Sequence, residues 1–284
     1  MKIVTQDYGC GTSSSILDYG IKDVVIVSPN DYEHVFTIQD DLFFVGHDFL
    51  FFLWDTKEKV ERWKDHNFRK AVWCFERIDA IVPAWQQKSQ HSLSILKQFV
   101  DQVYVCDEDD AEKYGDWFPQ WASLKFFEMK NNKPTIHDKY LFSGQAGKPE
   151  YHLRNELLNN IFSDPELKDL FQVTNINRTL TWENYCKNML NYTSIVNPVG
   201  ILRGFNTRTY EVLYAGRNLL QQTYGKYSRH EKLLSGHSNV ILFKTFDEMK
   251  EKVLKNYSNE SKPRKFYEKN SLYARFKLIG VDIK

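Results

Sequence analysis

The sequence has few cysteines, and their spacing excludes a zinc site and a dense disulfide framework. Only Cys10, Cys74, Cys106 and Cys186 occur in 284 residues, with no Cys-x-x-Cys pair and no His-rich neighbour. Structural zinc needs closely spaced Cys or His ligands, and disulfide-stabilised domains carry many cysteines in a short chain. The cysteines therefore indicate free thiols in a reducing compartment.

The sequence also lacks a long apolar segment near its first residue. Met1 is followed by a short apolar run that ends at Thr5, far below the length of a signal peptide or a membrane span. We therefore expect a cytoplasmic protein without a transmembrane segment.

Neither sign of charge is in excess. The chain has 38 Lys and Arg against 37 Asp and Glu, a formal net charge of +1. A global attraction to nucleic acid or to an anionic membrane is excluded, so any such affinity must be local. With 42% hydrophobic residues the chain is too apolar to be disordered, and its length suits two ordinary domains.

No repeat interrupts the chain, and short apolar segments alternate with amphipathic ones throughout. In the first half we expect strands at residues 2–5, 24–27, 49–53, 70–75 and 102–105, and helices at 13–19, 57–65 and 83–100. In the second half we expect strands at 140–143, 171–174, 194–197, 218–221 and 239–243, and helices at 153–162, 182–190, 207–215 and 246–256. Short, fully apolar strands are typical of a parallel sheet that is covered on both faces.

A polar stretch at residues 127–139, which contains Pro134, separates the two halves. The pattern predicts an α/β protein with two Rossmann-like domains that face each other across a cleft, where such proteins hold their ligands. We expect domains at residues 1–130 and 135–257, and a C-terminal segment at 258–284 that packs back on the first domain.

The segment after the strand at 194–197 is typical of an anion-binding loop. The expected strand ends at Asn197, Gly200 and Gly204 let the backbone turn closely, and Asn206 or Thr207 follows as a helix cap. The free amides at the start of that helix would face the loop.

Charged side chains lie beside these amides. Arg203 and Arg208 supply the positive charge that a diphosphate would need, and Glu211 could accept two hydroxyls of a ribose. The alternative is an ordinary strand, loop and helix in which Arg208 and Glu211 form a surface ion pair.

The helix from Arg208 to Glu211, with the following Tyr214 to Gly216, resembles the C-terminal domain of GT-B glycosyltransferases. The similarity is to the group that includes the CgeB-like spore-maturation proteins and the glycosyltransferase group 1 C-terminal domain. Residues 141–144 with Arg154, and residues 246–253, are similar to the segments that open and close that domain. The resemblance covers residues 140–257.

This resemblance implies transfer of a sugar from a nucleotide diphosphate sugar, with UDP as the expected nucleotide, to a hydroxyl acceptor. It implies that Glu211 binds the ribose and that Arg208 lies near the phosphates. The donor site expected on this basis comprises Gly144, Arg154, Gly200, Asn206, Thr207, Arg208, Thr209 and Glu211. No cofactor and no essential divalent metal are expected.

One position departs from the family pattern. Many retaining members carry an acidic residue eight positions before the ribose-binding one, where this chain has Arg203. Arg203 and Arg208 would instead stabilise the leaving diphosphate. The same departure is compatible with a non-catalytic protein that binds a nucleotide or a carbohydrate.

The first half offers weaker candidates. The turn with Gly9, Gly11 and Thr12 follows the first expected strand and could face the cleft, or it could be a tight turn without a ligand. Asp48 and Glu76 lie near expected strand ends and are the candidates for a general base, with ordinary loop residues as the alternative.

Two further signals each have two interpretations. Asp107 and Asp109 have the Asp-x-Asp form of a metal site, or they begin a helix. Residues 250–284 hold ten Lys and Arg against four Asp and Glu, with interleaved aromatics. That segment could contact a polyanion, as in a glycosyltransferase that acts on hydroxymethylated or otherwise modified DNA bases, or it could pack on the first domain.

Overall fold

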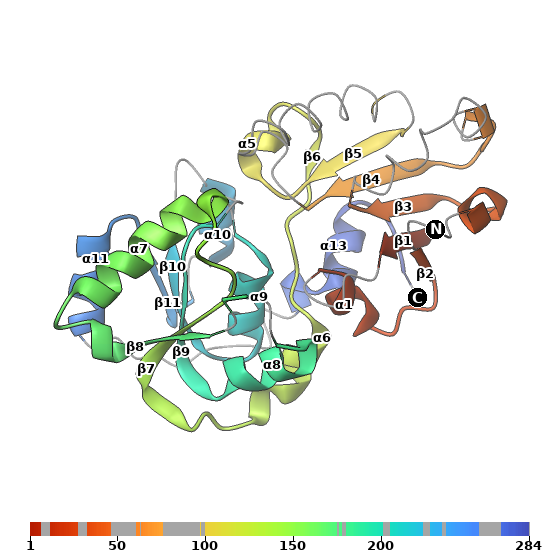
Figure 1. Ribbon diagram of the computed structural model, residues 1–284. Coiled ribbons are helices and arrows are strands. Elements are labelled where there is room, and N and C mark those ends of the chain that lie inside the picture. Colours follow the sequence, from red (N-terminus) through yellow and green to blue (C-terminus); the bar gives the residue numbers. More distant parts are fainter. Residues whose placement is uncertain are drawn as a thin grey trace. The chain divides into compact units, whose positions relative to one another are not determined.

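The structure is a computed structural model. It describes residues 1–6, 12–27, 33–46, 61–62, 64–75, 97, 100–174, 176–177, 180–200, 205–223, 228–234, 237–255 and 268–283. The chain divides into two compact units (Figure 1). The first comprises Met1–Pro119 and Arg275–Lys284, and the second comprises Gln120–Ala274.

The first unit is built on a six-stranded parallel sheet with the order β2-β1-β3-β4-β5-β6. Its strands are β1 (Lys2–Gln6), β2 (Val24–Val27), β3 (Leu42–Val45), β4 (Lys70–Cys74), β5 (Gln102–Val105) and β6 (Asp116–Trp117). Its described helical segments are α1 (Thr12–Leu17), η1 (Glu33–Thr37) and α5 (Glu108–Ala111), together with the end of α13 (Leu272–Leu278).

In β3, β4 and β5, consecutive residues are buried on opposite faces of the sheet, as the two-residue period of a strand requires. One face packs aliphatic side chains such as Val4, Val72 and Val105. The other packs aromatic rings, among them Phe43, whose ring lies 4.8 Å from that of Phe276 near the C-terminus. Part of the high aromatic content therefore belongs to the core of this unit.

The second unit is built on a five-stranded parallel sheet with the order β11-β10-β9-β7-β8. Its strands are β7 (Ile136–Ser143), β8 (Phe171–Thr174), β9 (Tyr192–Asn197), β10 (Asn218–Gln222) and β11 (Val240–Phe243). Its described α-helices are α6 (Leu124–Glu128), α7 (His152–Ser163), α8 (Trp182–Leu190), α9 (Thr207–Tyr214), α10 (Ser228–Leu234) and α11 (Phe246–Leu254). Short 3-10 segments are η2 (Met129–Asn131), η3 (Pro149–Tyr151) and η4 (Lys168–Leu170).

Helices cover both faces of this second sheet (Figure 1). Leu141, Ile195 and Leu219 pack in a cluster with side chains of α8 and α9. The residue after each of them, on the opposite face, packs in a cluster with α7 and α11. This alternation places α7 and α9 on opposite sides of the sheet.

The first helical residues are fixed by local capping bonds. The Thr181 hydroxyl accepts a hydrogen bond from the Asn184 amide, 3.3 Å away, at the start of α8. The Thr245 hydroxyl accepts one from the Glu248 amide, 3.2 Å away, at the start of α11. A threonine followed three residues later by a glutamate is a sequence signature of a helix start, which explains why α11 begins at the predicted residue.

The unit boundary lies before the polar stretch at residues 127–139, not within it. Phe126 is fully buried and packs edge-on against the rings of Trp182 and Tyr185 of α8, with centroids 6.0 and 6.2 Å away. The Ile136 amide donates to the Asn191 carbonyl at 2.9 Å, so the polar stretch leads into β7 within the second unit. Of the expected C-terminal segment, residues 275–284 belong to the first unit, and 258–267 lie outside the described residues.

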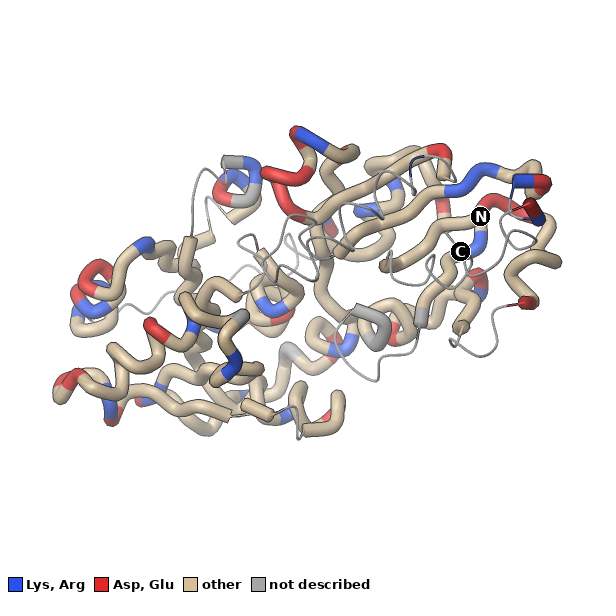
Figure 2. The backbone as a smooth tube through the Cα atoms, turned by 45° about the horizontal axis from the view of Figure 1, so that its top comes forward, with Lys and Arg blue, Asp and Glu red and all other residues tan. Residues whose placement is uncertain are grey.

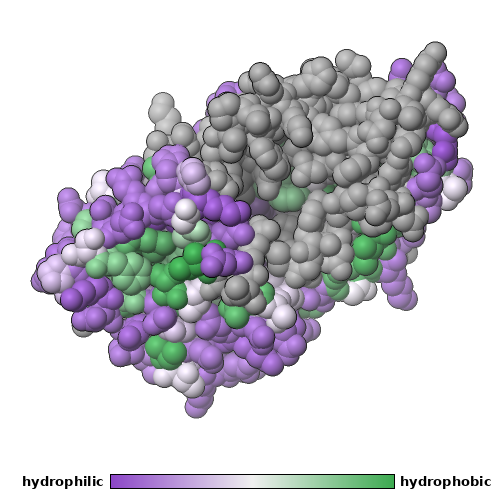
Figure 3. Space-filling view, viewed as in Figure 1, coloured by the Kyte–Doolittle hydropathy of each residue, from purple (hydrophilic) through white to green (hydrophobic). Residues whose placement is uncertain are grey.

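Two broader properties concern the surface. Acidic and basic residues are interspersed along the described chain (Figure 2), in keeping with the net charge of +1. On the face shown in Figure 3 the described surface of the second unit is largely hydrophilic, with apolar areas between. Among the described residues, no helix has the length and apolar character needed to cross a membrane.

Candidate functional site

Strand order singles out one edge of the second sheet. The chain leaves β7 toward β8 on one side and then continues through β9 on the other side, so the order reverses between β7 and β9. Parallel α/β sheets bind their ligands outside the carboxyl ends of the strands at such a reversal. There β7 ends at Ser143 and is followed by Gly144, while β9 ends at Asn197 and is followed by the loop with Gly200.

Two arginines predicted for the donor site meet at this edge. Arg154 comes from α7 and Arg208 from α9, on opposite sides of the sheet. The ring of Phe142, the penultimate residue of β7, lies 5.4 Å from the Arg154 guanidinium and 5.5 Å from that of Arg208. Tyr151 adds a second ring at 4.8 Å from Arg154, and Arg154 also donates to the Gln145 carbonyl.

Each arginine lies against the glycine that follows the other arginine's strand. A Cβ added to Gly144, after β7, would lie 2.4 Å from Nη2 of Arg208. A Cβ added to Gly200, after β9, would lie 2.4 Å from Nη2 of Arg154. Because side-chain carbons are not found at such distances, the absence of a Cβ at both positions makes room for the two guanidinium groups.

The two guanidinium groups of the site form no ion pair among the described residues, although the buried carboxylate of Glu211 lies nearby on α9. In the part of the chain that the structure describes, no carboxylate forms an ion pair with Arg154 or Arg208. Burial, and the neighbouring Arg208, lower the pKa of Arg154 to about 9, so Arg154 still carries its charge at neutral pH. Arg154 is 6% exposed, and within the described residues its Nε has no hydrogen-bond partner. A buried, uncompensated cation is the condition under which a bound anion is stabilising.

A polar network lies beside Arg208. Asn197 Oδ1 accepts from Nη1 of Arg208 at 3.2 Å. Asn197 Nδ2 donates to Asn206 Oδ1 at 3.0 Å, Thr209 Oγ1 at 3.0 Å and Gln221 Oε1 at 2.8 Å. The sequence therefore brings together the end of β9, the start of α9 and the end of β10 around one asparagine.

Asn206 stands at the cap position of α9, as expected, but its side chain makes no capping hydrogen bond. Its amide is engaged instead with Asn197, donating back to Asn197 Oδ1 at 3.4 Å. Thr207 is the first residue of α9. The Asn206 side chain is thus bonded to the last residue of β9 and does not cap the first amides of α9.

Glu211 is buried, which excludes the alternative of a surface pair with Arg208. It is 1% exposed, and its Oε2 accepts from the Tyr185 hydroxyl at 2.9 Å. Burial, with Glu211 alongside, raises the pKa of Tyr185 well above its usual value. The Tyr185 ring is stacked on Trp182, with centroids 5.4 Å apart. Glu211 and Tyr185 therefore connect α9 to α8 next to the arginines.

Several predicted residues lie outside the described residues. These are Gly9, Gly11, Asp48, Glu76 and Arg203. Thr12 is the first residue of α1. The expectations for the first unit and for Arg203 therefore stay predictions.

The Asp-x-Asp segment is a helix start. Asp107 is the N-cap of α5, and its Oδ1 accepts from the Asp109 amide at 3.0 Å. Acidic residues in a first turn are favoured by the helix dipole. This observation favours the helix interpretation over the metal interpretation.

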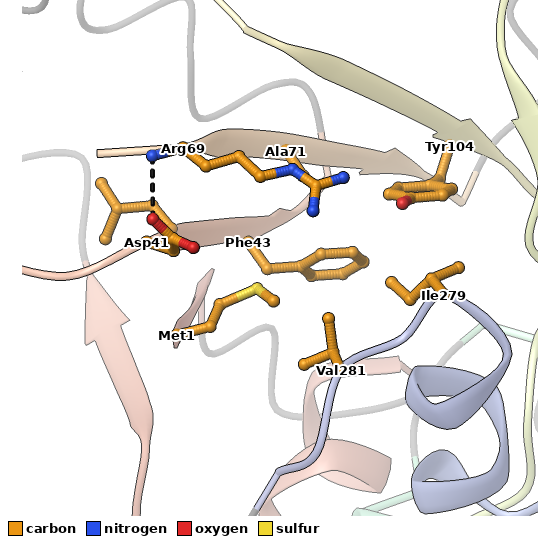
Figure 4. A pocket seen from close by; sticks show the side chains of 9 residues that line it. Met1, Asp41, Phe43, Arg69, Ala71, Tyr104, Ile279 and Val281 are labelled. Carbon is orange, nitrogen blue, oxygen red and sulfur yellow. Dashed lines mark hydrogen bonds between the residues drawn. The ribbon is translucent and has the colours of Figure 1, made fainter. Parts of the chain in front are cut away.

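A separate hollow lies in the first unit (Figure 4). Its lining is Met1, Asp41, Leu42, Phe43, Arg69, Ala71, Tyr104, Ile279 and Val281. Asp41 accepts from the Arg69 amide at 2.9 Å. Leu42 is the first residue of β3 and Ala71 the second residue of β4, so this hollow lies at the amino ends of these strands, opposite to the end where parallel sheets bind ligands.

No family model matches the chain, and no curated protein matches it.

Proposed function

We propose that this protein is a cytoplasmic GT-B-type glycosyltransferase whose second unit binds a nucleotide diphosphate sugar, with UDP as the expected nucleotide. The observation that carries the proposal is the pair of Arg154 and Arg208, which lie at the strand-order reversal without a carboxylate partner among the described residues. A diphosphate carries the negative charge and the oxygen acceptors that two guanidinium groups can bind. Cys74, Cys106 and Cys186 are buried and form no disulfide with one another, which fits a reducing compartment.

The reaction places its main electrostatic demand on the leaving group. The bond between the anomeric carbon and the diphosphate oxygen breaks, and the acceptor hydroxyl oxygen forms the new bond to that carbon. The hydroxyl proton passes to a base, for which Asp48 and Glu76 are the candidates. The bond electrons stay on the nucleoside diphosphate, where Arg154, Arg208 and Arg203 would stabilise the added negative charge.

The remaining donor contacts follow from the same edge of the sheet. The first amides of α9, at Thr207 and Arg208, would face the phosphates, as helix N-termini do. Glu211 is proposed to bind the ribose, with its carboxylate oriented by the hydrogen bond that Oε2 accepts from Tyr185. Thr209 would support the loop through Asn197.

The test is donor binding by calorimetry. Arg208→Gln and Arg154→Gln each remove one guanidinium, and we expect each to weaken UDP-sugar binding by about 10- to 100-fold, the worth of a charge-assisted hydrogen bond. Lys187→Gln is the control, because Lys187 is exposed and pairs with Glu183 on α8. Equal affinity in all four proteins would overturn the proposal.

A second measurement separates an enzyme from a binding protein. Incubation with a UDP-sugar labelled in the sugar should release UDP and transfer the label to an acceptor or to water. Tight donor binding without any release, over a panel of acceptors that includes modified DNA, would leave a nucleotide-sugar-binding protein instead.

A further inference from the structure

Two consecutive glutamines end β10, beside the strand whose loop carries Gly200. Gln221 and Gln222 point to opposite faces of the sheet, because successive residues of a strand alternate. Leu219, two residues before Gln221, packs with α9, and Leu220, two residues before Gln222, packs with the side that includes α7. Each glutamine therefore lies on the side of one arginine-bearing helix.

Gln221 fixes the orientation of Asn197. Its Nε2 donates to two backbone carbonyls, those of Asn197 at 3.3 Å and Gln222 at 2.8 Å. An amide has its donor and its acceptor on different atoms, so Oε1 of Gln221 must face the other way. There it accepts from Asn197 Nδ2 at 2.8 Å and from Thr209 Oγ1 at 2.7 Å.

The orientation is passed on to Arg208. With Nδ2 of Asn197 directed toward Gln221, Oδ1 of Asn197 is left to accept from Arg208 Nη1 at 3.2 Å. Asn197 and Gln221 are 1% and 2% exposed, so water does not compete for these bonds. The backbone carbonyls of Asn197 and Gln222 thereby determine that the oxygen of the Asn197 side-chain amide, and not its nitrogen, faces the Arg208 guanidinium.

Gln222 acts on the other arginine through the loop. Its Oε1 accepts from the Val199 amide at 3.0 Å. Val199 precedes Gly200, whose Cα faces the guanidinium of Arg154 so closely that an added Cβ would lie 2.4 Å from Nη2. A loop held at Val199 keeps Gly200, and with it the wall beside Arg154, in place.

We infer that Gln221 and Gln222 are positioning residues for the anion site, Gln221 for Arg208 through Asn197 and Gln222 for Arg154 through the Val199–Gly200 loop. The inference rests on the proposed binding of a diphosphate by the two arginines. Each of these two neighbouring glutamines thus orients one arginine, and the two arginines come from helices on opposite sides of the sheet.

The test is a set of double-mutant cycles with inorganic pyrophosphate as the probe, measured by calorimetry on the full chain. We expect Gln221→Met and Gln222→Met each to weaken pyrophosphate binding by about tenfold, the worth of one charge-assisted hydrogen bond held in line. Gln221→Met should have no further effect in an Arg208→Gln background, yet keep its full effect in an Arg154→Gln background. Gln222→Met should have no further effect in an Arg154→Gln background, and should keep its full effect in an Arg208→Gln background.

A general loss of structure would not produce this crossed pattern, because it would weaken binding equally in both backgrounds. Equal effects in both backgrounds, or unchanged affinity in the single variants, would overturn the inference. If Gln221→Met does not fold, Thr209→Val removes the hydroxyl that binds Gln221 and Asn197 in a nearly isosteric side chain, and the same coupling to Arg208 is expected. Unchanged pyrophosphate affinity in Arg208→Gln and Arg154→Gln alone would instead contradict the proposed function.

Discussion

Gly200 offers a way to move one guanidinium without removing it. An alanine Cβ at this position would lie 2.4 Å from Nη2 of Arg154 and 3.4 Å from its Cζ. The backbone of Gly200 is not among those with positive φ, so alanine is compatible with the backbone there. Within the described part of the chain, the added methyl group meets only the end of the Arg154 side chain, which must yield.

The displacement can be read from the geometry. Ordinary van der Waals contact begins at 3.4 Å, so Nη2 of Arg154 must retreat by about 1 Å from the added methyl group. Arg154 is held by the Gln145 carbonyl and by the rings of Phe142 and Tyr151, so it has few alternative positions. A shift of this size takes a guanidinium out of hydrogen-bond distance of a bound phosphate, and we expect pyrophosphate affinity to fall by about 10- to 100-fold.

Gly200→Ala should weaken pyrophosphate binding without lowering the stability of the protein. Replacing glycine by alanine at a compatible backbone position restricts the unfolded chain and stabilises a protein by about 0.4–1 kcal/mol. Displacing the Arg154 guanidinium from its contacts with Gln145, Phe142 and Tyr151 offsets part of this gain. Urea unfolding should therefore give a free energy of unfolding for Gly200→Ala that is equal to or slightly above that of the wild type.

The matched control is Gly147→Ala, in the loop after β7. An added Cβ at Gly147 meets no atom within 4 Å, but its φ of +85° is one that alanine rarely adopts. We expect this variant to lose about 1 kcal/mol of stability and to bind pyrophosphate like the wild type. If Gly200→Ala binds pyrophosphate with unchanged affinity, or if both variants lose affinity in proportion to stability, the argument from the Arg154 contact is refuted.

Two further predictions concern the stability of an Arg217 variant and the pH dependence of pyrophosphate binding. Arg217 donates to the Ala215 carbonyl at 3.0 Å and the Leu190 carbonyl at 2.9 Å, at the ends of α9 and α8, so Arg217→Met should lower the free energy of unfolding by about 2–4 kcal/mol, measured in urea. Because the pKa of Arg154 is lowered to about 9, its charge is present below that pH and is lost above it, so pyrophosphate affinity should fall as the pH rises through 9. Pyrophosphate affinity should be measured against pH for Arg154→Gln as well, because the ionisation of pyrophosphate itself affects both proteins alike. Identical pH profiles for the two proteins would contradict the prediction.

Much of the second unit could be predicted from the sequence, because its signals are local. The helix α8 and the strand β8 have the predicted bounds, and α9 and α11 begin at the predicted residues. Apolar runs of four to six residues between helix caps leave little choice of register. In the first unit, β3 was not expected, because its Leu42–Val45 run lies a few residues before the similar run at 49–53 and periodicity does not distinguish the two. Residues 49–53 lie outside the described residues.

The candidate site was predictable in its members but not in its geometry. Gly144, Arg154, Gly200 and Arg208 were all expected near a donor, and the structure places them at one edge of the sheet. Gly144, after β7, lies against Arg208 of α9, and Gly200, after β9, lies against Arg154 of α7. This exchange depends on the strand order, which the sequence does not specify. Gln222 was missed because its partner is 23 residues away on a neighbouring strand. Strand-end polar residues inside an otherwise apolar sheet are the signal that could have found both glutamines.

The arrangement of the arginines is itself an argument for a ligand. The lowering of the pKa of Arg154 to about 9 means that burial, and the neighbouring Arg208, disfavour its charged form by a few kcal/mol. A fold that needed this position only for packing would be more stable with an apolar side chain of similar volume. Arg154 donates to the Gln145 carbonyl, but a carbonyl is a neutral acceptor and does not balance the charge of the guanidinium. A bound anion would give the buried charge a partner. The free energy that burial of the Arg154 charge costs the folded protein would then be regained when the anion binds.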